Sequence, residues 1–214
     1  MARLRADALW LCPILIIHLC LTLPLAWKLN LWIDEASSLD TSGKSFLYAL
    51  RQAFTYELQA PLYFGLLNLW RIPSESIFHA RLFSVACTSL MLVLVVGIVR
   101  RYFPKLHPAW VVALLAVHPF TIWAATEIRV YALVMLLSAV LMRLFFDGFL
   151  AVAPQQHSRW GYFGIALLSL YTYYFLGFLL VAQGCALLVQ RRWSELRVLV
   201  GGVLLVGAGI VERE

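Results

Sequence analysis

Long apolar runs dominate the chain, and polar residues gather in the shorter segments between them. The hydrophobic stretches cover residues 8–27, 77–99, 108–125, 128–150, 160–189 and 196–211. A transmembrane helix needs about 20 apolar residues to cross a hydrocarbon core of about 30 Å, and most of these stretches reach that length. The pattern therefore predicts an all-α, polytopic transmembrane protein. A β-barrel would instead show segments of about ten residues with alternating polarity.

The stretch 160–189 is too long for a single crossing. At about 1.5 Å per residue it would form a helix of about 45 Å, so we expect a break near residues 171–174. This break gives about seven spans in a single transmembrane domain of residues 1–214. One tilted helix is the alternative, and it would reverse the direction of everything that follows.

Composition agrees with a membrane protein, because 63% of the residues are hydrophobic, 13% are charged and the mean hydropathy is +0.84. A soluble domain carries a larger share of charged residues. No small-residue cleavage site follows the first apolar run, so this run is predicted to remain as an uncleaved signal anchor. The expected surroundings are membrane lipids, and we expect no nucleic acid as a partner.

Residues 28–76 separate the first two apolar runs, and we predict that they form an outer loop lying along the membrane. The apolar residues that share one face at helical spacing are Phe46, Leu47, Leu50, Phe54 and Leu58. This spacing is typical of an interfacial helix, although packing against neighbouring spans would give the same periodicity. A full span at residues 61–71 is a rival topology, but its apolar part is too short.

Lysine and arginine are distributed unevenly between the two sides of this topology. With the N-terminus in the cytoplasm, ten basic residues lie on the inner side and six on the outer side, as the positive-inside rule requires. The inner ones are Arg3, Arg5, Arg100, Arg101, Lys105, Arg143, Arg159, Arg191, Arg192 and Arg197. The acidic residues of the outer side are Asp34, Glu35, Asp40, Glu57, Glu75 and Glu127. We therefore predict a multi-pass protein of the cell inner (plasma) membrane.

Two adjacent carboxylates, Asp34 and Glu35, directly follow the first span. Acids at a membrane edge are candidates for chemistry, but the same residues can begin an interfacial helix, whose dipole favours negative charge there. Glu127 and Arg129 can likewise form a solvated pair at a helix start. Arg81 can extend toward the lipid headgroups.

Other polar residues give weaker signals. Arg143 and Asp147 lie four residues apart near the inner end of a span, and we interpret them as a local ion pair. The cysteines and histidines do not have the spacing of a metal site, so no divalent metal is indicated.

Four short pieces of the chain occur in the order found in one family of membrane enzymes. They are Asp34-Glu35, Ala60-Pro61-Leu62-Tyr63-Phe64, Arg81-Leu82-Phe83-Ser84 and Glu127-Ile128-Arg129-Val130-Tyr131. Through these pieces, residues 27–150 resemble the N-terminal part of a GT-C fold glycosyltransferase of the protein mannosyltransferase and aminoarabinose transferase group. Members of this group use polyprenyl-phosphate sugars as donors.

The chain also departs from this family. Members often have His-x-Pro-Pro where this chain has Glu57-Leu58-Gln59-Ala60-Pro61, and some have Tyr-Thr-His where it has Tyr171-Thr172-Tyr173. They usually have more spans than this chain, so the resemblance implies that the chain is the N-terminal portion of a longer GT-C module.

The resemblance implies transfer of a monosaccharide from a polyprenyl-phosphate donor to an acceptor hydroxyl at the outer face. Asp34 would act as the general base, and Glu35 would orient the acceptor or the base.

The same resemblance implies a substrate site around the lipid phosphate. Arg81 or Arg129 would stabilise the departing phosphate by charge-assisted hydrogen bonds, and Glu127 and Tyr131 would complete the site. No cofactor is implied, and neither the sugar nor the acceptor follows from the sequence.

Two other functions fit the sequence. A transporter or flippase-like protein would use Asp34, Glu127 and Arg129 to bind an ion or a substrate, but such proteins place ionisable groups near the midplane and often carry repeats. An inactive truncated fragment is the other alternative.

Overall fold

The computed structural model describes the backbone of residues 2–211 and the side chains of residues 9–204. Helices are the only regular secondary structure in this described part, which confirms the predicted all-α class. The α-helices are α1 (Ala2–Lys28), α2 (Ile33–Thr41), α3 (Phe46–Thr55), α4 (Leu62–Arg71), α5 (Ile77–Tyr102), α6 (Pro108–Val117), α7 (Pro119–Thr126), α8 (Tyr131–Phe145), α9 (Gln156–Thr172), α10 (Gly177–Val189) and α11 (Trp193–Val211). A π-helical segment (Phe146–Leu150) continues α8, and a 3₁₀ turn (Tyr174–Leu176) precedes α10.

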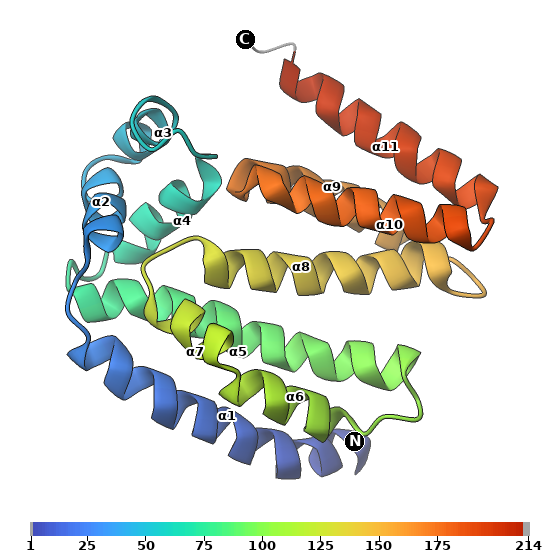
Figure 1. Cartoon of the computed structure of the whole chain (residues 1–214), viewed down its shortest axis with the longest axis horizontal. Coiled ribbons are helices and arrows are strands. Elements are labelled where there is room, and N and C mark those ends of the chain that lie inside the picture. Colours follow the sequence, from blue (N-terminus) through green and yellow to red (C-terminus); the bar gives the residue numbers. More distant parts are fainter. Residues whose placement is uncertain (1, 212–214) are drawn as a thin grey trace.

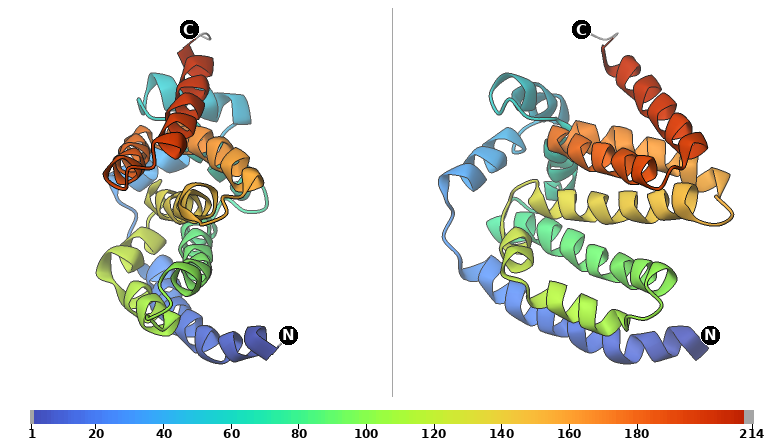
Figure 2. Two further views of the ribbon diagram at one scale, coloured as in Figure 1. Left: turned by 90° about the vertical axis from the view of Figure 1, so that its right-hand side faces the viewer. Right: turned by 45° about the vertical axis from the view of Figure 1, so that its right-hand side comes forward.

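The long helices lie side by side, and consecutive ones run in opposite directions (Figure 1). Helix α5 packs against α1, α6, α7 and α8, so it is the centre of the N-terminal half. Helix α9 packs on α8, and α10 packs on α11, which extends the array toward the C-terminus (Figure 2).

Three helical segments are long and apolar enough to cross a membrane, namely Leu9–Lys28, Ile77–Tyr102 and Tyr131–Leu150. Helices α6 and α7 are a fourth candidate if they form one broken span, because they meet at 58°. Among the described residues, the structure thus supports three or four of the roughly seven spans that the sequence predicted.

The predicted span at residues 108–125 is not continuous, because its helix breaks at His118. Pro119 has no N–H to donate and disfavours helical backbone in the residue before it, so His118 adopts ψ 130°. The His118 ring then accepts a hydrogen bond from the Phe120 N–H and caps α7.

The predicted break within residues 160–189 is confirmed. Helix α9 ends at Thr172, and Tyr173 is extended before the 3₁₀ turn leads into α10. The chain therefore folds back on itself here.

Helices α2, α3 and α4 cover one end of the long helices, whereas the α5–α6 and α10–α11 connections lie at the opposite end (Figure 1). We call the first the α2–α4 end and the second the loop end. Helix α4 has ten residues, or about 15 Å, which is about half the length that the rival span at residues 61–71 would need. The predicted Arg143–Asp147 ion pair lies at the loop end, with 2.7 Å between Nε and Oδ2, and is confirmed.

Helix α3 turns its small residues inward. Ala49 and Ala53 are fully buried, and α3 packs on α4 and α2 rather than on a long helix. On the other side Leu47 and Phe54 are 76% and 58% exposed. An apolar face that no other part of the described chain covers is what an interfacial helix presents to lipid.

Candidate functional site

Glu35 and Arg81 form a buried ion pair that joins α2 to α5. Arg81 Nη2 lies 2.7 Å from Glu35 Oε2, and Arg81 Nε lies 3.0 Å from Glu35 Oε1, so the contact is bidentate. Glu35 is 0% and Arg81 1% exposed. Both residues were candidates from the sequence, and the structure brings them together out of reach of solvent.

The remaining Arg81 donors hold the end of α1. Nη1 donates to the carbonyl oxygens of Ala26 and Leu29 at 3.0 and 2.8 Å, and Nη2 donates to that of Asn30 at 3.2 Å. The last carbonyls of a helix lack partners within the helix, and a cation is favourable there. A guanidinium has five N–H donors, and all five of Arg81 are therefore engaged.

Glu35 has a further partner, since its Oε1 also accepts the N–H of Ile128 at 3.0 Å. The pair therefore fixes α1, α2, α5 and the α7–α8 connection to one another. This arrangement is typical of a structural centre, and it orients the neighbouring residues of α2 and of the α7–α8 connection.

Asp34 and Arg129 lie at the accessible edge of this centre. The side chain of Asp34 is 44% exposed, and its Oδ2 lies 3.7 Å from Arg129 Nη2. Arg129 Nη1 also donates to the Asp34 carbonyl and to Ser38 Oγ, at 3.3 and 3.4 Å. These contacts are long, and the buried Arg129 Nε has no partner among the described residues, so the guanidinium has donor capacity left. The accessible Asp34 carboxylate thus stands beside the guanidinium of Arg129, whose side chain is 13% exposed.

The Glu127 carboxyl contacts Trp32 in the α1–α2 connection. Trp32 Nε1 donates to Glu127 Oε2, and Ser84 Oγ donates to the Glu127 carbonyl at 2.6 Å. Burial raises the pKa of the Glu127 carboxyl above its usual range, although the Trp32 hydrogen bond opposes the shift. The carboxyl therefore accepts a proton more readily than a solvated glutamate does.

Two tyrosines, Tyr131 and Tyr173, pack against the buried cluster that contains Ile128 and Val130, the neighbours of Arg129 in the sequence. The half-buried ring of Tyr131 packs on Trp123, with 4.9 Å between centroids. Burial is the main cause that raises the pKa of the Tyr173 hydroxyl above its usual range. The positive charge of Arg129 acts in the opposite direction. The Tyr173 hydroxyl therefore stays protonated at neutral pH.

Three residues that the fold brings to this end were not among the site candidates from the sequence, namely Ser38, Glu57 and Tyr63. Ser38 contacts Arg129, and Glu57 Oε1 accepts hydrogen bonds from Ser37 Oγ and Thr41 Oγ1 at 2.7 and 2.9 Å. Tyr63 is 1% exposed, and its hydroxyl has no partner among the described residues. Tyr63 belongs to Ala60-Pro61-Leu62-Tyr63-Phe64, one of the four pieces that carry the family resemblance. That membership was the one signal in the sequence that could have identified Tyr63 as a candidate.

No group of three or more His, Cys, Asp or Glu side chains within the described part of the chain is placed to hold a metal ion.

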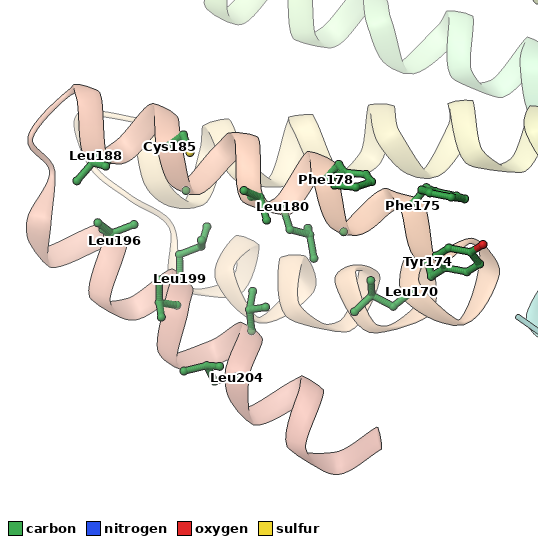
Figure 3. Close-up of a pocket in the computed structure, with 15 residues that line it drawn as sticks. Leu170, Tyr174, Phe175, Phe178, Leu180, Cys185, Leu188, Leu196, Leu199 and Leu204 are labelled. Carbon is green, nitrogen blue, oxygen red and sulfur yellow. The ribbon is translucent and has the colours of Figure 1, made fainter. Parts of the chain in front are cut away.

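An apolar groove of about 750 Å³ runs along α10 and α11 (Figure 3). It begins at Tyr174, the residue after Tyr173, and continues along Phe178, Leu188 and Leu199. The groove therefore starts next to Tyr173 and extends toward the loop end.

The chain matches no family model, no curated protein and no solved structure.

Proposed function

We propose that this chain is a GT-C type membrane glycosyltransferase, or the N-terminal portion of one, with a polyprenyl-phosphate monosaccharide as donor. The observation that carries the proposal is the exposed Asp34 carboxylate beside Arg129, at the end of several membrane-length apolar helices. A polyprenyl phosphate keeps its tail among lipids and its charged head at the interface. Such a substrate would meet a base and a cation together at this place.

The chemistry needs one proton acceptor and one stabiliser of negative charge. The acceptor hydroxyl gives its proton to Asp34 as its oxygen bonds to the anomeric carbon. The bond from that carbon to the phosphate oxygen breaks, and its electron pair stays on the lipid phosphate. The configuration at the anomeric carbon is inverted.

Arg129 is the better candidate for the lipid phosphate. Arg81 was an equal candidate by sequence, but its five donors already serve Glu35 and the end of α1. In this proposal Arg81 and Glu35 are positioning residues that hold Asp34 and Arg129 in place. Glu127 and Tyr131 border the substrate.

The apolar groove supports a lipid-linked donor. An isoprenoid tail has no polar groups to satisfy, and the lining residues of the groove are almost all aliphatic or aromatic. Because the groove starts beside Tyr173, one molecule could place its phosphate at Arg129 and its tail along α10.

The proposal includes the finer topology predicted from sequence. The chain would cross the inner (plasma) membrane about seven times, with its N-terminus in the cytoplasm and the α2–α4 end outside. The positive-inside count supports this orientation, because the loop end carries Arg100, Arg101, Lys105, Arg191 and Arg192. A transporter is a weaker candidate, since Asp34 and Arg129 lie at one end of the helices rather than near their middle.

The test is the substitution Asp34→Asn in the protein expressed from its full native reading frame. An amide keeps the shape and cannot accept the proton, so transfer from a panel of radiolabelled polyprenyl-phosphate sugars should fall by about 10²- to 10⁴-fold. Donor affinity and thermal stability should stay close to the parental values. Asp40→Asn is the matched control, because Asp40 is an exposed acid on the same helix.

Parental transfer rates in the Asp34→Asn protein would rule out the base assignment. Loss of folding rather than of rate would favour the simpler role of Asp34 at the start of α2.

A further inference from the structure

The side chain of Tyr63 is buried, and its hydroxyl makes no hydrogen bond within the described part of the chain. Its ring packs against Phe64 and Phe83, with 5.2 and 6.2 Å between centroids, while the hydroxyl has no hydrogen-bond partner. Buried hydroxyl groups in folded proteins are nearly always paired, because an unpaired one loses its water and gains nothing in return. The exception at Tyr63 therefore needs an explanation.

The position of Tyr63 is fixed by several strong contacts along α4. Asn68 Nδ2 donates to the carbonyls of Ser42 and Lys44 at 2.9 and 2.7 Å. Arg71 Nη1 donates to the Leu39 carbonyl and to Ser42 Oγ at 2.6 and 2.8 Å. Helix α4 is thus attached to the end of α2 and to the turn that follows it, and the Tyr63 hydroxyl cannot easily move to find another partner.

A second unpaired donor belongs to Arg129. Its Nε is buried and has no partner among the described residues, and Ile128 and Val130, on either side of Arg129 in the sequence, belong to the same buried cluster as Tyr63. Burial raises the pKa of the Tyr63 hydroxyl well above its usual range, although the charge of Arg129 opposes the shift. The hydroxyl therefore stays protonated at neutral pH and can act as a donor toward an anion.

We propose that the Tyr63 hydroxyl and the Arg129 Nε–H donate together to oxygens of the lipid phosphate, so that Tyr63 is a second phosphate ligand. The proposal rests on the function proposed above. A phosphate has several oxygens in a tetrahedral arrangement, so one group can accept from both donors. Both hydrogen bonds strengthen when the sugar departs and negative charge accumulates on the phosphate.

The first test compares Tyr63→Phe with the parent protein, expressed from its full native reading frame, for binding of a short-chain polyprenyl phosphate in detergent. The probes are the phosphate, the corresponding polyprenol and inorganic phosphate. Loss of a hydrogen bond to a charged group should weaken binding of the polyprenyl phosphate by about tenfold or more. Thermal stability should be unchanged or higher, because the substitution removes a buried unpaired group. Tyr56→Phe is the control, since Tyr56 is 67% exposed in the same loop region.

The second test observes the hydroxyl directly. Site-specific 3-fluorotyrosine at position 63 should change its ¹⁹F chemical shift when the polyprenyl phosphate or a high concentration of inorganic phosphate is added. The polyprenol should leave the signal unchanged.

The outcomes separate this proposal from the proposed function. If Arg129→Ala loses phosphate binding while Tyr63→Phe keeps it, Tyr63 is no ligand, although the proposed function stands. If the parent does not prefer the phosphate over the polyprenol, the proposed function fails, and the Tyr63 proposal fails with it. A lower stability of Tyr63→Phe with unchanged binding would assign the residue a packing role and overturn the proposal.

Discussion

Asp34 and Glu35 are neighbours in sequence, but the fold gives them opposite environments. Successive residues on a helix point about 100° apart, so α2 turns Glu35 toward Arg81 and leaves Asp34 at the surface. Both carboxylates could be predicted as candidates from the sequence, but the difference in their solvent exposure could not. That distinction depends on the packing of α2 against α5, which brings together residues 46 positions apart.

The Arg81–Glu35 pair leads to a prediction about stability. Arg81→Met should lower the free energy of unfolding by about 3–5 kcal/mol, because it leaves the buried Glu35 carboxylate without its partner. The carbonyls at the end of α1 would also lose their donor. Unfolding by titration with a denaturing detergent measures the effect.

Two variants accompany this measurement. The double substitution Arg81→Met with Glu35→Met should recover part of the loss, because no buried charge remains. Arg129→Met should be milder, since Asp34 is its partner and is 44% exposed. A parental unfolding free energy in Arg81→Met would contradict the structural role.

At the scale of elements, the apolar runs predicted the longest helices well. Helices α1, α5 and α8 follow from length and hydropathy, because a span must bury its backbone polar groups internally over the whole bilayer. The bend at His118 was missed, although Pro119 was the local signal for it. The contact of Trp32 with Glu127 had no local signal at all, because it joins residues 95 positions apart.

Helix α3 is predicted to lie in the membrane interface. Leu47 projects from its exposed face, whereas Thr55 lies about 80° further round the helix at the polar edge. Spin labels at single cysteines should therefore report higher accessibility to oxygen at position 47 and to a polar nickel reagent at position 55. Equal accessibility to the nickel reagent at both positions would mean that α3 stands clear of the lipid.

At the scale of the whole molecule, charge is sorted between the two ends. Asp34, Glu35 and Glu127 meet at the α2–α4 end, while Arg101 and Arg143 share Asp147 at the loop end. Because consecutive long helices run in opposite directions, the connection before each helix and the connection after it lie at opposite ends of the molecule. The positive-inside count could predict this sorting because each charge lies near a helix end.

The sorting predicts which residues an impermeant thiol reagent can reach in intact cells. Single cysteines at Asp40 and Glu75 should be labelled from outside, and those at Lys105 and Gln190 only after permeabilisation. All four positions are exposed. The background would lack Cys12, Cys20, Cys87 and Cys185, so that each label reports one site.

Gln190 is the most informative of the four positions, because it follows both α9 and α10. If these helices cross the membrane as two spans, Gln190 returns to the side of Lys105. If they act as one tilted span, Gln190 reaches the opposite side and is labelled in intact cells together with Asp40. Labelling of Asp40 and Glu75 from different sides would contradict the topology as a whole, because it would require a span within α2 to α4. None of those helices exceeds ten residues, which is about half the length that a bilayer requires.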